Sequence, residues 1–234
     1  MPKENLTKKF VHTIKQRILN GEYKIGDSFP PLRKLAQEFE CSRSVINVGI
    51  ARLEEQGYLL VQKRQKTITN DFINRGSLDT VKDMALCQNC KLRKKAAKDI
   101  LEARLLIELK SVKDAAANPQ DLEELFEVIE REEKLVKENS KDYHKLAEYD
   151  FKFHYRLIKM SGNMVYFAVM NSFKDTALEM TKIFYKNNIE RFKEYVEKHR
   201  LIADAISQKD GERAAEILEE ILTHGEKLYK IFND

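Results

Sequence analysis

The sequence contains no tryptophan, and its 234 residues include only 8 glycines, 4 prolines and 3 cysteines. No apolar run approaches the roughly 18 residues that a helix needs to span a bilayer. The N-terminal stretch MPKENLTKKFVHTIK has no apolar signal-peptide core. These absences predict a cytoplasmic protein without a membrane segment. With so little glycine and proline, 34% charged and 42% hydrophobic residues indicate a mainly α-helical protein with a packed core.

The sequence has three cysteines, Cys41, Cys87 and Cys90. This low and odd number argues against a disulfide framework. Cys87 and Cys90 form a CxxC motif, but no second CxxC and no nearby histidine completes a four-ligand zinc site. A redox pair is one interpretation of the motif. Two thiols in a surface segment of a reducing cytosol is the other interpretation, and it is the one that we favour.

Positive charge is concentrated at the N-terminal end. Residues 1–70 contain 13 lysines and arginines against 7 acidic residues, whereas the remainder contains 29 against 31. A basic segment joined to a near-neutral body favours a polyanionic partner, although many basic segments are only solvated faces.

The stretch from Phe29 to Gly57 predicts two short helices joined by a tight turn. Ser42 is a good N-cap for the second helix. Arg43, Ser44 and Asn47 fall on the first turn and a half of that helix, away from its apolar face. Side chains in these positions can contact phosphates and base edges in the major groove of DNA. The apolar face of the second helix consists of Val45, Ile46, Ile50 and Leu53.

Two short β-type runs follow the helix pair, YLLVQ at 58–62 and TITN at 67–70. A hairpin with the basic tip KRQK is typical of a wing beside a helix-turn-helix. Lys63, Arg64 and Lys66 are therefore candidates for contacts with the backbone or minor groove of DNA. A solvated tip explains any one of them equally well, but explains the set less well.

In this region the sequence resembles the GntR family of bacterial winged helix-turn-helix regulators. The family pattern LPSERxLAxxLGVSRxxVREALxxLxxxGL aligns in register with FPPLRKLAQEFECSRSVINVGIARLEEQGYL. The resemblance implies DNA-contacting roles for Arg33, Ser42 and Arg43, with Ser44 as a conservative counterpart. Asn47 stands where the family has a second arginine on the recognition helix. Leu32 replaces an acidic residue, and RQK at 64–66 replaces the glycines of the wing.

The rest of the chain has helical periodicity. We assign 1–72 to a winged helix-turn-helix domain, 73–97 to a linker with a possible short helix, and 98–234 to an all-helical domain. Polar or glycine-containing breakers separate its segments, which predicts an antiparallel bundle. The six predicted helical segments are 98–116, 120–138, 142–160, 164–187, 189–209 and 212–232.

Four residues of the predicted bundle are candidate metal ligands: Asp150, His154, His199 and His224. Asp150 and His154 are four residues apart and so share one helix face. His199 and His224 lie among apolar residues on two later helices. Converging imidazoles and a carboxylate would suit Zn²⁺, Ni²⁺ or a similar divalent ion. Spacing alone does not establish convergence, and a lone histidine on a bundle face is more often structural.

The same residues make the C-terminal part similar to the FCD ligand-binding domain of the FadR subfamily. Its metal-binding members carry a DxxxH motif, a later HxxI and a last histidine, which correspond here to Asp150 with His154, His199 with Ile202, and His224. The resemblance implies all four metal ligands. It also places Arg104 at a cavity, where a guanidinium beside a metal can bind a carboxylate through two hydrogen bonds. A surface salt bridge of Arg104 with Glu102 or Glu108 is the alternative.

These patterns predict a homodimeric DNA-binding transcription regulator rather than an enzyme, with repression as the expected outcome. A small carboxylate or sugar-acid effector would bind at the metal site and control affinity for a double-stranded operator. Two alternatives remain open at this stage, a metal-dependent hydrolase-like enzyme and a regulator whose metal is purely structural. No separate general base, nucleophile elbow or glycine-rich phosphate loop supports the enzyme.

Overall fold

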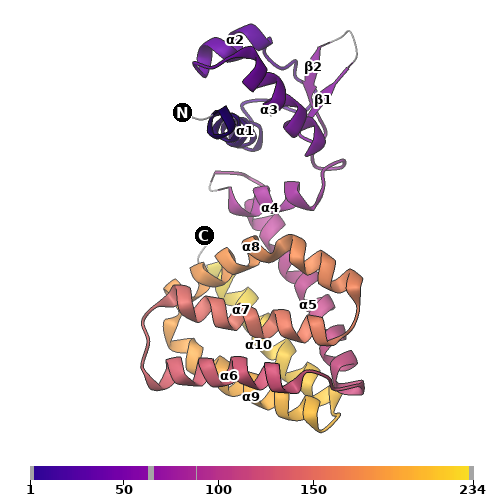
Figure 1. Ribbon diagram of the computed structural model, residues 1–234, viewed down its shortest axis with the longest axis vertical. Coiled ribbons are helices and arrows are strands. Elements are labelled where there is room, and N and C mark those ends of the chain that lie inside the picture. Colours follow the sequence, from indigo (N-terminus) through magenta and orange to yellow (C-terminus); the bar gives the residue numbers. More distant parts are fainter. Residues whose placement is uncertain (1–2, 63–65, 88, 232–234) are drawn as a thin grey trace. The chain divides into compact units, whose positions relative to one another are not determined.

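The computed structural model describes residues 3–62, 66–87 and 89–231. In that part of the chain it contains ten α-helices, one short 3-10 helix and one antiparallel pair of strands (Figure 1). The predicted mainly α-helical fold is confirmed. The chain divides into two compact units, Met1–Ala97 and Lys98–Asp234, each with buried apolar residues of its own. None of the described helices is long and apolar enough to cross a membrane.

The first unit is built around the contact between α1 and α3. Phe10 and Ile14 on α1 and Ile46 on α3 are fully buried. Gly49 of α3 allows the close approach, because a Cβ atom there would lie 2.3 Å from the Phe10 ring. The elements of this unit are α1 (Lys3–Leu19), α2 (Leu32–Glu38), α3 (Arg43–Glu55), β1 (Leu59–Val61), β2 (Thr67–Thr69) and α4 (Leu78–Leu86).

The turn between α2 and α3 forms as the sequence predicts. Glu40 adopts a left-handed conformation with φ of 49°. Ser42 then caps α3 by accepting a hydrogen bond from the Val45 backbone N–H at 3.4 Å. At the start of α2, Pro31 is the N-cap and the helix begins at Leu32, so both prolines of the PP pair precede the first turn.

The predicted hairpin is present, with β1 and β2 antiparallel and Leu59 paired with Thr69. Residues 63–65 at its tip lie outside the described residues, and so do the roles predicted for Lys63 and Arg64. Lys66, next to β2, is described and exposed.

The second unit contains one helix for each of the six predicted segments. α5 begins at Arg93, ahead of the predicted start at 98. Asp142 and Asn163 cap α7 and α8 through side-chain oxygens that accept backbone N–H groups. The helices are α5 (Arg93–Ala117), α6 (Leu122–Lys137), α7 (Tyr143–Met160), α8 (Met164–Asn187), α9 (Phe192–Ser207) and α10 (Gly211–Ile231), with a 3-10 turn at Ile189–Arg191.

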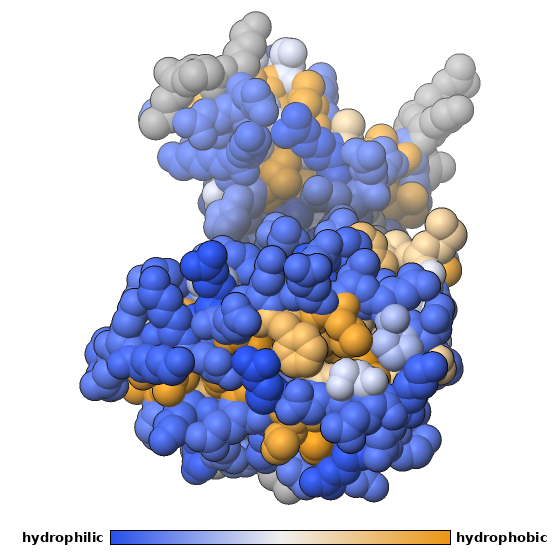
Figure 2. All heavy atoms as spheres, turned by 60° about the horizontal axis from the view of Figure 1, so that its bottom comes forward, coloured by the Kyte–Doolittle hydropathy of each residue, from blue (hydrophilic) through white to orange (hydrophobic). Residues whose placement is uncertain are grey.

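Successive packing of these helices makes the core of the second unit. α7 packs against α8 and α6, α6 packs against α9, and α9 packs against α10. Phe153 of α7, Ile129 of α6 and Ile202 of α9 are fully buried in one cluster. On the face shown in Figure 2 the unit is mostly hydrophilic, with an apolar band across it. α7 is thus held between neighbours on two sides, which fixes the direction of the polar side chains that it carries inward.

Candidate metal centre and nucleic-acid interface

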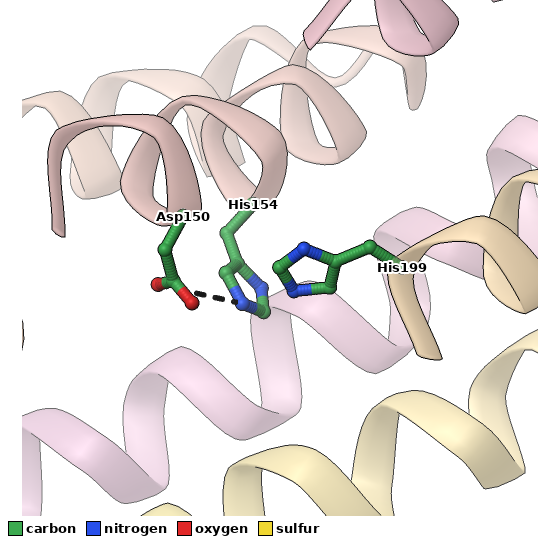
Figure 3. Close-up of side chains that lie close together, drawn as sticks. All are labelled: Asp150, His154 and His199. Carbon is green, nitrogen blue, oxygen red and sulfur yellow. Dashed lines mark ion pairs between the residues drawn. The ribbon is translucent and has the colours of Figure 1, made fainter. Parts of the chain in front are cut away.

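Asp150, His154 and His199 come together inside the second unit. α7 supplies Asp150 and His154 one turn apart, and α9 supplies His199 (Figure 3). One potential ligand atom from each lies within 4.8 Å of the others, and all three side chains are buried. The convergence that spacing could not establish is therefore present for these three residues.

Each histidine ring is anchored by a buried carboxylate that faces its Nδ1 atom. His154 Nδ1 lies 2.6 Å from Glu108 Oε2 of α5, and His199 Nδ1 lies 3.0 Å from Glu132 Oε2 of α6. Both glutamates are completely buried. A carboxylate behind a metal-ligating histidine fixes the tautomer and leaves Nε2 with its lone pair directed to the ion. Sequence inspection named Glu108 only as a possible partner of Arg104 and did not name Glu132, because no local motif links either glutamate to the histidine that it faces.

The Nε2 atoms are the free ends of this arrangement. His199 Nε2 is buried and has no hydrogen-bond partner among the described residues. His154 Nε2 lies 3.9 Å from Asp150 Oδ2, whose other carboxylate oxygen accepts a hydrogen bond from Tyr185 Oη at 2.7 Å. A divalent ion with bonds of about 2.0–2.2 Å would bring such atoms to within roughly 3–4 Å of one another. The residues present therefore fit a divalent cation after a small inward shift.

The electrostatics of the centre are dominated by buried charge. Burial alone would raise the pKa of Glu108, but the Arg104 guanidinium and His154 lower it to about 2. Burial would likewise lower the pKa of His199, but the facing Glu132 carboxylate raises it. Burial raises the pKa of Glu132, which His199 only partly offsets. A cation would be attracted to this acidic surrounding and would displace any proton on His199 Nε2, while the hydrogen bond between Nδ1 and Glu132 could remain.

His224 does not join the cluster. It is half-buried on α10, and its Nδ1 lies 3.3 Å from Tyr195 Oη. Within the described residues, the group of ligand atoms that lie within 4.8 Å of one another has only Asp150, His154 and His199 as members. The role of His224 as a fourth ligand stays a prediction.

Arg104 combines the two roles considered from sequence. Its Nε donates to Glu108 Oε1 one turn further along α5, so the salt bridge is formed. The pair is buried, however, with Arg104 11% and Glu108 0% exposed, and is not a surface bridge. Arg104 also lines a cavity of ≈ 70 Å³ beside the centre. The remaining lining residues are Leu101, Asp150, His154, Met180, Thr181, Phe184, Tyr185, Tyr195, Ile221 and Leu222.

The predicted DNA-reading residues share one property, which is exposure. All of them are exposed, and only Ser42 has an internal hydrogen bond, the cap of α3, within the part of the chain that is described. Such side chains are available to a partner, whereas the apolar face of α3 is buried. The residues in question are Arg33, Ser42, Arg43, Ser44 and Asn47.

An exposed polar recognition helix beside a hairpin, followed by a helical domain with an internal polar cavity, defines the winged helix-turn-helix regulators that carry a ligand-sensing domain. The chain belongs to the gntR family of bacterial regulatory proteins, whose family model matches residues 6–68, and carries an FCD domain at residues 99–224. It is a DNA-binding transcription regulator with an effector-binding domain. The matching families and relatives are transcription regulators and not enzymes, so the hydrolase-like alternative falls away.

Two relatives illustrate the match. The chain is 26% identical to the transcriptional regulator LutR of Bacillus subtilis over 206 residues, covering 84% of this chain and 89% of LutR. It is 24% identical to the Uxu operon regulator of Haemophilus influenzae, covering 86% of this chain and 73% of that protein.

Solved structures share the fold. Lar, which controls the expression of the Listeria monocytogenes agr system, superimposes with a TM-score of 0.62 at 18% identity, with 96% of each chain covered. A GntR protein of Streptococcus agalactiae gives a TM-score of 0.50 at 22% identity, with 96% of this chain and 99% of that chain covered.

Proposed function

We propose that Asp150, His154 and His199 hold a divalent cation, Zn²⁺ or Ni²⁺, through which the effector-binding domain senses its ligand. The buried, unpartnered Nε2 of His199 carries this proposal, because an orphaned buried acceptor is costly unless a ligand completes it. The two carboxylates behind the histidine rings support it. When bound, the cation would supply a Lewis-acidic position for an anionic ligand. His224 would complete the set if Tyr195 released it.

We infer that the effector is a small carboxylate or sugar acid. Arg104 lines the cavity with four further N–H donors beyond the Nε that it gives to Glu108. A cavity of only ≈ 70 Å³ favours a compact acid over a long chain. The apolar wall of Met180, Phe184 and Leu222 would cover the rest of the ligand.

We further propose that the protein acts in the cytoplasm as a homodimeric repressor on a pseudo-palindromic operator. A dimer would present two copies of α3 to successive major grooves. Exposed apolar side chains in the second unit, with Leu106 72%, Met164 80% and Val165 62% exposed, support a protein partner for that unit. Effector binding would shift DNA affinity only if the effector binds the two conformational states unequally.

The first test is the metal content of the purified protein, measured by elemental mass spectrometry and paired with thermal melts with and without chelator. We expect about one divalent ion per chain and a melting temperature that falls on chelation. His199→Ala should remove the ion, while His144→Ala, at an exposed position on α7, should retain it. Absence of any divalent ion from wild-type protein, even after incubation with Zn²⁺, would contradict the metal proposal.

The sensing role is tested separately by operator binding in the presence of candidate acids. His199→Ala should bind DNA as the wild type does and should lose the response to the effector. A variant that has lost both the ion and thermal stability but still responds normally would show that the cation is purely structural.

A further inference from the structure

The CxxC motif lies in the first unit, between α4 and the start of α5. Cys87 is the C-cap of α4, and α5 begins three residues beyond Cys90 at Arg93. Both thiols are buried, with Cys87 1% and Cys90 7% exposed. The segment lies at the surface, with Leu86 and Lys91 exposed, but it turns both of its sulfur atoms inward.

The thiol of Cys87 is bonded to the end of α1. Its Sγ donates to Gln16 Oε1 at 3.2 Å and lies 3.5 Å from Asn20 Oδ1. Cys90 Sγ accepts the backbone N–H of Leu92 at 3.4 Å, in the turn that leads into α5. Burial raises the pKa of Cys90, and the nearby Cys87 thiol raises it further. One thiol thus anchors the chain to α1, and its neighbour belongs to the approach to α5.

A separate set of hydrogen bonds holds α4 to α1. Asp83 Oδ2 accepts from Lys15 Nζ at 2.7 Å and from Tyr58 Oη at 2.8 Å. Asp83 thus holds α4 to α1 and to the start of the hairpin, and the dithiol follows directly after α4. A covalent change at the dithiol would act on the segment through which the DNA-binding unit continues into α5.

We propose that Cys87 and Cys90 form a reversible dithiol–disulfide site that is oxidised by a peroxide and that lowers operator affinity when oxidised. The site lies within the first unit and does not depend on the metal proposal. Disulfides in proteins that otherwise carry free thiols are commonly transient and serve redox sensing.

The reaction has two balanced steps. A thiolate attacks one peroxide oxygen, the O–O bond breaks, the sulfur is oxidised to a sulfenic acid, and the released hydroxide takes up the thiol proton as water. The second thiol attacks the sulfenic sulfur, the S–S bond forms, the S–O bond breaks, and the hydroxide leaves as a second water with the remaining proton. Two electrons pass from the sulfur pair to the peroxide.

Burial shapes the kinetics of these steps. Burial raises the pKa of Cys90, so its thiolate is scarce at neutral pH and the first step is slow and faster at higher pH. The second step is fast, because the partner thiol is already adjacent. Disulfide formation removes the S–H donor that Cys87 gives to Gln16 and constrains the turn before α5.

The test uses the full chain and hydrogen peroxide, followed by intact-mass analysis under non-reducing conditions. We expect a monomer lighter by about 2 Da with two thiols lost, and full recovery with dithiothreitol. Cys41→Ser should behave in the same way, since Cys41 lies apart from the pair. At about the peroxide concentrations that convert the wild type, neither Cys87→Ser nor Cys90→Ser should lose 2 Da.

Operator affinity is then compared between reduced and oxidised protein, on DNA selected from random sequence by the reduced form. We expect operator affinity to fall reversibly by at least about fivefold on oxidation, which is the lower end of ordinary coupling between sites. This loss should occur in the wild type and in Cys41→Ser but not in the Cys87→Ser and Cys90→Ser variants. If Cys87 and Cys90 stay reduced while Cys41 is oxidised, the site does not exist. If the disulfide forms and affinity is unchanged, the regulatory role is overturned.

Discussion

His199 uses one ring nitrogen within the fold and leaves the other without a partner. Glu132 holds Nδ1, Phe153 stacks on the ring at 3.8 Å between centroids, and Nε2 is buried with no partner in the described residues. His154 repeats the pattern with Glu108 behind it. A buried carboxylate behind each ring supports the proposed role of both histidines as metal ligands.

Replacement of the carboxylate behind His199 is the sharpest test at the residue scale. Glu132→Gln should weaken affinity for Zn²⁺ roughly 10–100-fold. The neutral amide would no longer fix the His199 ring, and the ring would become a less basic ligand. Competition against a chelating dye measures the change. Glu133→Gln is the matched control. Glu133 follows Glu132 in the chain, is one third exposed and pairs with Arg200. Equal metal affinity in both variants would show that Glu132 does not act on the site.

Asn47 is exposed on α3, one turn after Arg43, where the family pattern has arginine. Asn pairs bidentately with adenine and Arg with guanine, each contact discriminating by about 1–3 kcal/mol. Asn47→Arg should therefore move the preferred base at one operator position from adenine toward guanine. Selection of sites from random DNA by both proteins reads this out, and an unchanged preference would place Asn47 away from the bases.

At the scale of elements, the cap and the turn around α3 were predictable because they are local. Ser42 and the inward face of Val45, Ile46 and Leu53 follow from spacing alone, and all are placed as expected. The attachment of α4 was not predictable. It depends on Asp83 meeting Lys15 and Tyr58, which are 68 and 25 residues away, and no periodicity encodes such a meeting.

Asp83→Asn should release α4 from α1. Loss of the charged acceptor leaves Lys15 and Tyr58 with weaker partners and should cost about 1–3 kcal/mol. Hydrogen exchange of the α4 amides should rise accordingly. Asp79→Asn, on the same helix, removes only an exposed ion pair with Lys82 and should cost less than about 1 kcal/mol. Equal exchange in the two variants would show that the hydrogen bonds of Asp83 do not hold α4.

At the scale of the whole molecule, charge divides between the ends of the chain. Residues 1–70 carry 13 basic and 7 acidic residues, and the remainder is near balance at 29 and 31. The affinity of the basic DNA-binding unit for DNA should therefore depend on the release of counterions from DNA. The near-neutral sensing domain should contribute little to this release.

For a dimer that neutralises about six phosphates, log K should fall against log salt concentration with a slope near −5. Fluorescence anisotropy with a labelled operator across a salt series measures this slope. Lys66→Ala should reduce its magnitude by about 2 in a dimer if Lys66 contacts phosphate in both subunits. An affinity that does not change with salt would remove the phosphate contacts from the picture.

The sequence by itself determined the helical class, the winged helix-turn-helix with its cap, and the identity of Asp150, His154 and His199 as candidate ligands. These depend on composition, periodicity and motifs that are local in the chain. Only the tertiary structure decided that three of the four ligands converge, that Glu108 and Glu132 stand behind them, that Arg104 is buried against Glu108, and that the CxxC thiols face inward. Each of these depends on which helices pack together. Helices distant in sequence pack through the burial of their apolar faces, and this driving force is non-directional. The sequence pattern around a polar residue therefore does not reveal which other polar residues the packing brings next to it.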